Sequence, residues 1–146
     1  MTVLDMATIV CIGLMIGVEF AVSAFINPVL WRLERGAQME AIRMFAVKLG
    51  FVMPFWYGLG LVLLLVQTFM VRHQAVVVPA AVASGIWALV IVLTLMYLVP
   101  INNKFAREET AGVTAAERDH RRWDGMHRWR VAALTAAMVI FLMSVK

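Results

Sequence analysis

The chain has 146 residues, of which 63% are hydrophobic and only 15% are charged. Soluble globular domains are about half apolar and about a quarter charged, so this composition excludes an ordinary water-soluble domain and a disordered chain. The net charge of +4 does not indicate nucleic acid binding, because in so apolar a chain basic residues gather beside one membrane face. The sequence predicts a single integral membrane domain in the lipid bilayer.

Four apolar stretches are long enough to cross the hydrocarbon core, which takes about 20 residues of helix. We expect spans over residues 6–30, 44–70, 75–99 and 129–145. Irregular backbone cannot face lipid, so the predicted fold class is all-α, a transmembrane four-helix bundle. The first stretch is predicted to be a span rather than a signal peptide, since no basic residue precedes it.

Basic residues are concentrated on one side of the predicted bundle. Eleven of the thirteen Lys and Arg residues lie in or beside the connections after the first and third spans: Arg32, Arg35, Arg43, Lys48, Lys104, Arg107, Arg118, Arg121, Arg122, Arg128 and Arg130. The other side has only Arg72 and Lys146. The positive-inside rule predicts that both connections are cytoplasmic and that both termini lie outside the cytoplasm, in the inner or an equivalent cell membrane.

The connection between the third and fourth spans is predicted to be largely helical. Thr114 and Glu117 have the spacing of an N-terminal capping box, and Gly112 lies where a preceding helix can end. Glu117 and Arg121 have the i,i+4 spacing of a favourable ion pair. We therefore expect helices 3 and 4 to extend past the membrane into the cytoplasm.

Glu19 lies near the middle of the first span, where an ionisable side chain is costly and usually faces protein or water. Ser23 and Asn27 follow at four-residue intervals, so the three side chains share one flank of the helix. Hydrogen bonding between helices is sufficient to explain Ser23. For Glu19 we favour a functional role, because a buried carboxyl is an expensive way to hold helices together.

Trp123, His127 and Arg130 fall at positions i, i+4 and i+7 of the fourth helix. At ~100° per residue they lie on one face within about 60°. An aromatic ring, a titratable imidazole and a fixed cation in this register can bind and turn over a planar or anionic molecule. The alternative is anchoring at the membrane interface, where Trp and Arg are common.

Counting inward from the cytoplasmic ends of the spans places Glu19 opposite Trp56 and Tyr57 of the second span. Asn27 and His127 should lie nearer the cytoplasm, ~12 Å away from Glu19 by helical rise. These positions predict a polar, aromatic-lined pocket that opens toward the cytoplasm and has Glu19 at its floor.

Pro100 interrupts the hydrogen bonding of the third span near its cytoplasmic end. Asn102 and Asn103 follow directly. Their amides either satisfy the carbonyl groups that the proline leaves without a donor, or present donors to a cavity.

Several cofactor motifs are absent from the sequence: the Walker loop, the Gly-rich dinucleotide fingerprint, CxxC and HExxH. The sequence leaves three alternatives open: no cofactor, a mononuclear metal held by Glu19 and His127, or haem held through His127. His73 and His120 are expected to be exposed surface histidines.

Two segments at the junction of the third and fourth helices, VPINNK at 99–104 and RWDGMHRWR at 122–130, resemble a known family. It is a family of small four-helix membrane proteins that includes the anthrone oxygenases of aromatic polyketide pathways. Phe25 and Pro28 of the first span, and Trp56 and Tyr57 of the second, also resemble its pattern.

The resemblance implies a membrane oxidoreductase that inserts oxygen into an activated aromatic carbon and turns an anthrone into an anthraquinone. Such substrates ionise to an electron-rich enolate that reacts with dioxygen directly, so a base and a cation to hold the anion would suffice. The resemblance implies His127 as the base, with Asn102 and Arg130 steadying the oxyanion and Trp123 stacking on the ring system.

Together these patterns predict a hydrophobic aromatic small molecule as substrate, with Glu19 as a further catalytic residue. Its contacts are predicted to include Asn27, Asn103, Trp56 and Tyr57. A non-catalytic accessory protein that binds haem, a metal or a lipid is the second interpretation. A small transport component with Glu19 in an ion path is the third, and either it or the enzyme could be a homo-oligomer.

Overall fold

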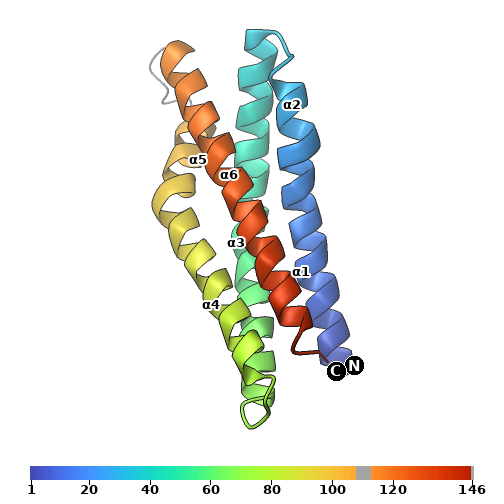
Figure 1. Cartoon of the computed structure of the whole chain (residues 1–146). Helices are drawn as coiled ribbons and strands as arrows, with labels where there is room; N and C mark the ends of the chain where they lie inside the picture. The colour runs from blue at the N-terminus through green and yellow to red at the C-terminus, as the bar shows by residue number, and fades with distance from the viewer. Residues whose placement is uncertain (108–112, 146) are drawn as a thin grey trace.

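The structure is a computed structural model that describes residues 1–107 and 113–145, with the backbone alone at 113–116. All regular elements in this part of the chain are helical, and they form four long segments side by side (Figure 1). The segments are α1 (Val3–Ala21), η1 (Val22–Ile26) and α2 (Asn27–Leu30); α3 (Arg35–Met70); α4 (Val77–Leu93), η2 (Thr94–Leu98) and α5 (Val99–Ala106); and α6 (Val113–Leu142). The predicted all-α, four-helix fold class is confirmed.

Three of the four segments are long and apolar enough to cross a membrane: Val3–Leu30, Arg35–Met70 and Val77–Ala106. Their outward faces carry many exposed large apolar side chains, which lipid can cover at no cost. α6 has its apolar stretch in the C-terminal half, directly after Arg128 and Arg130. Gly112, the predicted end of the preceding helix, and the side chain of Thr114, which belongs to the predicted capping box of this helix, lie outside the described residues.

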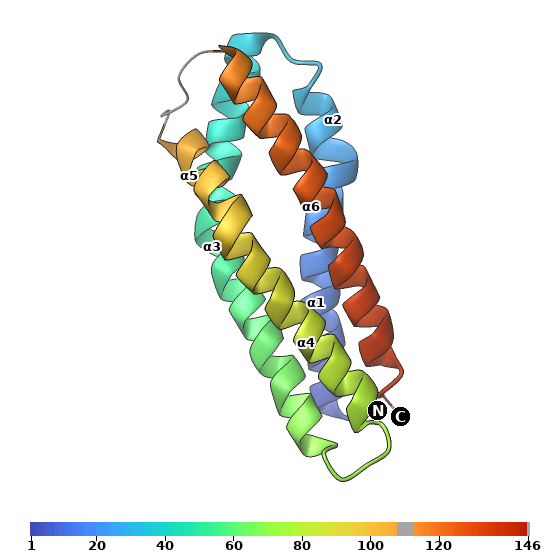
Figure 2. The same cartoon turned by 60° about the vertical axis from the view of Figure 1, so that its left-hand side comes forward.

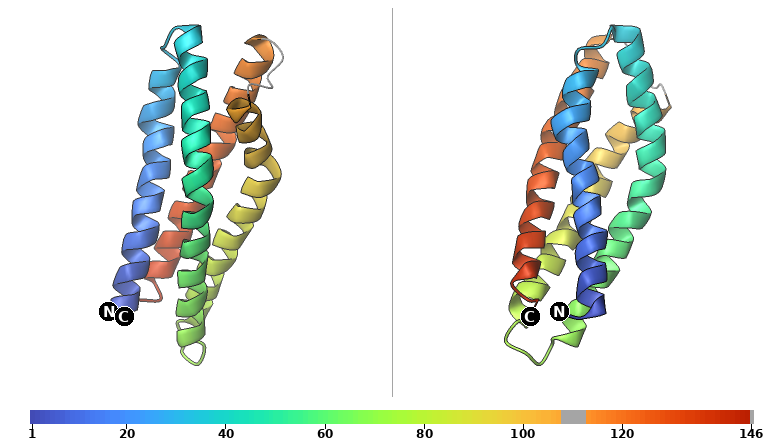
Figure 3. Two further views of the ribbon diagram at one scale, coloured as in Figure 1. Left: turned by 180° about the vertical axis from the view of Figure 1, so that it is seen from behind. Right: turned by 90° about the vertical axis from the view of Figure 1, so that its right-hand side faces the viewer.

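Both termini lie at one end of the bundle, while the α2–α3 connection and the start of α6 lie at the other (Figures 1 and 2). α6 packs along α4 and also contacts α1, and α3 contacts α1, α4 and α5. The third segment bows outward at η2 and returns toward α3 at α5 (Figure 3). The bundle is therefore closely packed near the termini and more open toward the opposite end.

The two π-helical segments share one cause. η1 is followed by Pro28 and η2 by Pro100, and each proline removes a backbone donor from the helix it enters. A π turn absorbs the break by adding one residue to the turn, and such turns are frequent at functional sites. The proline that predicts an irregular third helix thus produces its outward bend.

Close packing of α1, α3 and α4 depends on Gly60. A Cβ atom there would lie 2.7 Å from Cζ2 of Trp87 and 3.3 Å from Cγ2 of Ile12. Trp87 is fully buried and donates a hydrogen bond from Nε1 to the carbonyl of Tyr57 at 3.1 Å. The indole therefore fixes both the spacing and the register of α3 against α4.

We expect Gly60→Ala to destabilise the fold by about 1–3 kcal/mol, the usual cost of overpacking a core that cannot give way. Gly58→Ala is the matched control, because a Cβ at Gly58 meets nothing within 4 Å. Unfolding of both variants in detergent, followed by tryptophan fluorescence, measures the difference. Equal stability of the two variants would contradict the role assigned to Gly60.

Candidate functional site

Glu19 is the centre of a buried polar cluster that joins three helical segments. It lies in α1 and is 2% exposed. Its Oε1 accepts a hydrogen bond from the hydroxyl of Tyr57 in α3 at 2.9 Å, and its Oε2 accepts one from Nη2 of Arg130 in α6 at 2.6 Å. A buried carboxylate needs such partners because removing an isolated charge from water costs several kcal/mol. Glu19 is thus one half of a buried ion pair.

His127 lies one turn before Arg130 on α6 and is 1% exposed. Its Nε2 lies 3.1 Å from the carbonyl oxygen of Glu19, and its Nδ1 lies 2.8 Å from Nη2 of Arg130. A guanidinium group only donates, so Nδ1 accepts from Arg130 and Nε2 carries the hydrogen donated to the carbonyl. Nδ1 also lies 3.2 Å from Oε2 of Glu19. The cluster therefore places a neutral imidazole where a proton gained on Nδ1 would face a carboxylate.

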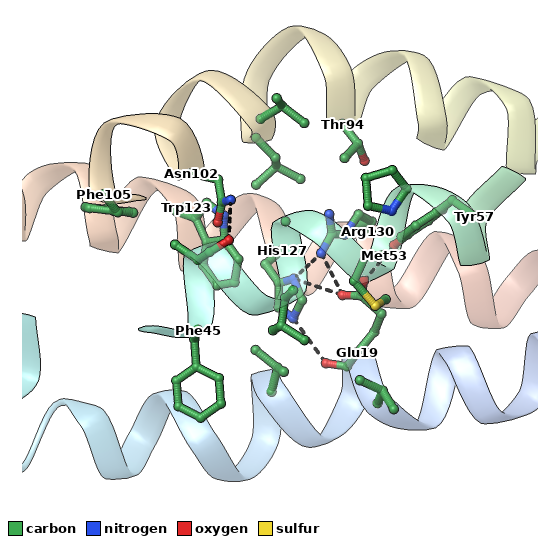
Figure 4. Close-up of a pocket in the computed structure, with 18 of the residues that line it drawn as sticks. Glu19, Phe45, Met53, Tyr57, Thr94, Asn102, Phe105, Trp123, His127 and Arg130 are labelled. Carbon is green, nitrogen blue, oxygen red and sulfur yellow. Dashed lines mark hydrogen bonds and ion pairs between the residues drawn. The ribbon is translucent and has the colours of Figure 1, made fainter. Parts of the chain in front are cut away.

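Trp123 stacks on His127, with ring centroids 4.6 Å apart and planes 10° from parallel. The guanidinium carbon of Arg130 lies 5.6 Å from the centroid of the Tyr57 ring. Trp123, His127 and Arg130 point to one side of α6, as their spacing predicts (Figure 4). Nε of Arg130 is buried and has no hydrogen-bond partner among the described residues, which leaves one donor for a ligand.

These side chains line one wall of a cavity of about 530 Å³ between all four segments. Cavities that hold small organic molecules are commonly about 300–1,000 Å³ and mostly apolar, with a few polar groups that fix orientation. This cavity fits that description, since Ile, Leu, Val, Met and Phe side chains supply most of its surface. Its chemistry is concentrated in five polar or charged residues around its deep end: Glu19, Tyr57, Thr94, His127 and Arg130.

Asn102 and Asn103 line the cavity nearer the α5 end. Nδ2 of Asn102 donates to the carbonyl of Ala46 at 3.0 Å, so this amide links α5 to α3. The approach requires Gly50, where a Cβ atom would lie 2.8 Å from that nitrogen. An amide nitrogen has two hydrogens, so Asn102 keeps a second donor. Asn103 is exposed at the rim.

Asn27 lines the cavity from α2 and is buried. Its Nδ2 donates to Oδ1 of Asp124 at 2.8 Å, and Arg128 donates to Oδ2 of the same carboxylate at 3.0 Å. Asn27 therefore joins the first segment to α6. The i,i+4 spacing of Asp124 and Arg128 predicts their ion pair, which is confirmed, whereas the contact of Asp124 with Asn27 was missed by sequence reasoning.

Trp56 does not line the cavity. Its Nε1 donates to the carbonyl of Cys11 in α1 at 3.0 Å, whereas the adjacent Tyr57 faces Glu19. Neighbouring residues of a helix point about 100° apart, so only one of the pair can face a given site. The structure brings Tyr57 into the cluster and places Trp56 at the α1–α3 contact.

His120 is 3% exposed, so the prediction that it is a surface histidine was wrong. Its ring stacks on Trp31, with centroids 4.3 Å apart, and meets the edge of Phe105 at 6.3 Å. Burial lowers the pKa of His120 below its ordinary value, which favours the neutral ring within this aromatic stack. The stack closes the end of the cavity that lies away from Glu19. His73 is exposed, as expected.

Thr94 is a second residue that sequence reasoning missed. It is the first residue of η2 and lines the cavity, and its Oγ1 is buried without a hydrogen-bond partner among the described residues. A hydroxyl in a helix commonly bonds to the carbonyl one turn earlier, so an unpaired one beside a cavity can serve a ligand. Its signal in the sequence is weak: one threonine in an apolar run.

The donor set does not suit a metal or a haem iron. The guanidinium of Arg130 lies 2.6 Å from the Glu19 carboxylate and 2.8 Å from Nδ1 of His127, so a fixed positive charge sits where a cation would bind. The other nitrogen of His127 faces a carbonyl. Among the described residues, no group of three or more His, Cys, Asp or Glu side chains has metal-binding geometry. We therefore derive no step through a metal.

Comparison with known proteins adds one finding. The family "Anthrone oxygenase" matches residues 42–140, about two thirds of the chain, which includes the part of α3 with Tyr57 and the part of α6 with His127 and Arg130. No curated protein and no solved structure matches the chain. The matched segment contains both signature segments at the junction of α5 and α6. The chain belongs to the anthrone oxygenase family.

Proposed function

We propose that the protein is a membrane oxygenase that converts an anthrone-type aromatic ketone into the corresponding quinone. The observation that carries the proposal is the Glu19–Arg130–His127 cluster, in which Glu19 and His127 are buried and Arg130 is largely so, at the wall of an apolar cavity of about 530 Å³ in a chain of this family. A base beside a fixed cation, with water excluded, is what the ionisation of a weakly acidic aromatic ketone requires.

The apolar walls of the cavity suit a fused-ring substrate. Burial of such a ring system contributes roughly 25 cal/mol per Å² of apolar surface, without demanding polar contacts along its length. The two charged side chains, Glu19 and Arg130, lie at one end together with Tyr57, Thr94 and His127, so this end would bind the substrate's oxygen atoms and set its orientation. Trp123 contributes an aromatic face on the same wall, next to the ring of His127.

The reaction needs no reductant other than the substrate. A ring CH₂ group and one molecule of dioxygen give a ring carbonyl and one molecule of water. The four electrons that reduce dioxygen come from the carbon, which loses two C–H bonds and gains a C=O bond. The protein has to supply a base for the first proton and charge stabilisation for the enolate, because that anion reacts with dioxygen directly.

We assign the base to His127. When Nδ1 takes the proton, both ring N–H groups face oxygen atoms of Glu19: the carboxylate at 3.2 Å and the backbone carbonyl at 3.1 Å. The enolate oxygen is assigned to Arg130, whose Nε has no partner among the described residues, and to the hydroxyl of Thr94. As Arg130 turns toward the carbonyl oxygen of the bound ketone it releases Nδ1, so substrate binding frees the base before the proton is taken. Tyr57 holds the carboxylate in place.

Oxygen uptake tests the proposal. The purified protein in lipid nanodiscs is supplied with a dihydroxyanthrone, and oxygen consumption and quinone absorbance are followed together. We expect a rate well above the autoxidation measured with empty nanodiscs. With ¹⁸O₂ the label should enter the new carbonyl, and with H₂¹⁸O it should not. A rate equal to that of empty nanodiscs, or label derived from water, would overturn the proposal.

A lipid-binding accessory role is the second candidate, and the apolar lining of the cavity favours it. It predicts binding of a hydroxyanthraquinone or an acyl chain without any oxygen uptake.

The distribution of basic residues supports a location in the inner or an equivalent cell membrane, with both termini outside the cytoplasm. The two termini lie together at one end of the bundle, and most Lys and Arg residues lie away from that end.

A further inference from the structure

The lining of the cavity reaches the outer surface between α3 and η2. α3 contacts α4 on one side of this point and α5 on the other, and it parts from η2 between them. Four residues line the cavity and are also exposed at the outer surface here; we call them the portal: Gly50, Pro54 and Gly58 of α3 and Leu95 of η2. Leu95 is 58% exposed.

Two tight contacts define the ends of the portal. Near α5, the amide of Asn102 bonds to the carbonyl of Ala46 in the space left by Gly50. Near α4, Trp87 bonds to the carbonyl of Tyr57 across Gly60. Gly50 and Gly60 are ten residues apart, which is ~15 Å along the helix axis. The portal is thus a gap between two fixed points rather than a loosely packed helix pair.

Local sequence keeps the portal open. Gly58 contributes no side chain to it, and a Cβ atom there would meet nothing within 4 Å, whereas the space beside Gly50 is taken by the amide of Asn102. On the opposite side, η2 and the following Pro100 bend the third segment away from α3. The absence of a side chain at Gly58 and the bend at η2 both widen the gap between α3 and the third segment.

The portal lies between two segments that can each cross a membrane, Arg35–Met70 and Val77–Ala106. Its rim is apolar and therefore compatible with lipid, which does not tolerate unpaired polar groups. Just inside lies Thr94, whose unpaired hydroxyl is followed deeper in the cavity by Arg130 and Glu19 (Figure 4). A molecule that moves inward from the hydrocarbon would therefore pass from apolar surface to its first polar contact.

We propose that this portal is the route by which a lipophilic aromatic substrate enters the cavity directly from the bilayer. The identity of the substrate rests on the proposed function, whereas the route rests on the geometry of α3 and η2. A fused-ring ketone dissolves in hydrocarbon rather than in water. Access from the bilayer spares it the transfer into water that a cytoplasmic opening would impose.

Photolabelling tests the route without any catalysis. A lipid-soluble aryl diazirine in proteoliposomes gives a carbene that inserts where the probe reaches, and mass spectrometry locates the adducts. We expect adducts on Met53 and Leu98, which are buried and line the cavity. Gly58→Phe should lower this labelling about tenfold, equivalent to a barrier about 1.4 kcal/mol higher. Gly85→Phe is the matched control, since Gly85 is an exposed glycine of α4 outside the cavity with nothing within 4 Å.

Exchange kinetics separate a blocked route from a filled cavity. Binding of a hydroxyanthraquinone is followed in nanodiscs by stopped-flow tryptophan quenching. A blocked portal should slow association and dissociation equally, by about tenfold, and leave Kd unchanged, because a barrier does not alter the end states. Leu95→Ala should speed both rates. If the new phenylalanine instead occupied the cavity itself, it would weaken binding through faster dissociation.

The outcomes are distinguishable. Cavity residues that stay unlabelled in the unmodified protein, labelling that survives Gly58→Phe, or a change in Kd with an intact association rate would each overturn the portal. Labelling that depends on Gly58 without any hydroxyanthraquinone binding would support the portal and count against the proposed substrate class.

Discussion

Arg130→Met is expected to cost about 3–5 kcal/mol of stability, the largest effect of any single substitution considered for this protein. Arg130 is 11% exposed in its side chain and lies 2.6 Å from the carboxylate of Glu19. Its removal takes away the one fixed positive charge beside the buried carboxylate, which keeps the hydroxyl of Tyr57 at 2.9 Å and Nδ1 of His127 at 3.2 Å as neighbours. Methionine fills a similar volume, so the loss reports the charge rather than a cavity.

Two further variants complete this test. Glu19→Gln combined with Arg130→Met removes both charges and should recover most of the stability, because the cost comes from the charge left alone. Arg128→Met is the matched control on the same helix: its side chain is 61% exposed and pairs with Asp124 at 3.0 Å. That change should cost at most about 1 kcal/mol.

Detergent unfolding followed by tryptophan fluorescence gives all of these free energies. If Arg130→Met is as stable as Arg128→Met, the buried ion pair does not organise the bundle. If the double variant is no more stable than Arg130→Met alone, the loss arises from packing and not from the charge of Glu19.

His127→Phe is expected to lower the turnover of an anthrone by about 10²–10⁴-fold, the usual contribution of a positioned base. Phenylalanine keeps an aromatic ring against Trp123 but has no lone pair to take the proton. The carbonyl of Glu19 still accepts a hydrogen bond from the backbone of Val22, so loss of the imidazole leaves it satisfied. The fold should therefore survive.

The measurement is the rate of quinone formation above the autoxidation of empty nanodiscs, together with the Kd for a hydroxyanthraquinone. Turnover should fall while Kd stays close to that of the unmodified protein. His73→Phe makes the same change at an exposed histidine and should leave turnover unaffected. A fully active His127→Phe variant would remove His127 from the mechanism and shift attention to Glu19.

Hydropathy was sufficient to predict the helices, because each apolar run must satisfy its own backbone in lipid. It was less informative about their ends. α3 begins at Arg35, well before the apolar stretch at 44–70, since a helix continues past the hydrocarbon as long as its hydrogen bonds are made. The predicted contact of Glu117 with Arg121 was replaced by an ion pair between Glu117 and Arg35. That partner comes from another helix, where local spacing gives no signal.

Parts of the candidate site could be anticipated from the energetic cost of burying a charged group and from the spacing of residues along a helix. Glu19 attracts attention because a carboxyl in the middle of a span is expensive. Helical spacing places Trp123, His127 and Arg130 on one face, and counting by depth brings Tyr57 opposite Glu19. These inferences require only the positions of residues within one helix, or the relative depth of residues in two helices whose direction across the membrane is known.

The rest depends on how the helices rotate about their axes. Asn27 meets Asp124 across 97 positions of sequence, and His120 is buried only because Trp31 and Phe105 come together around it. Hydropathy fixes where a helix lies along the membrane normal but not which side it presents to its neighbours. For the same reason, the sequence could not show which of Trp56 and Tyr57 faces the cavity.

The two π turns preserve the phase of their helices as well as bending them. Each takes one residue more than a regular turn, so the extra residue is absorbed where it occurs and the helix beyond it keeps its phase. A residue deleted from regular α-helix is not absorbed and rotates everything beyond it by about 100° relative to what precedes it. Such a deletion in α1 would turn Asn27 away from Asp124, and one in α4 would turn Asn102 away from Ala46. Length variation in this family is therefore expected to fall in the π turns and in the connections between helices, and to spare the regular parts of α1 and α4.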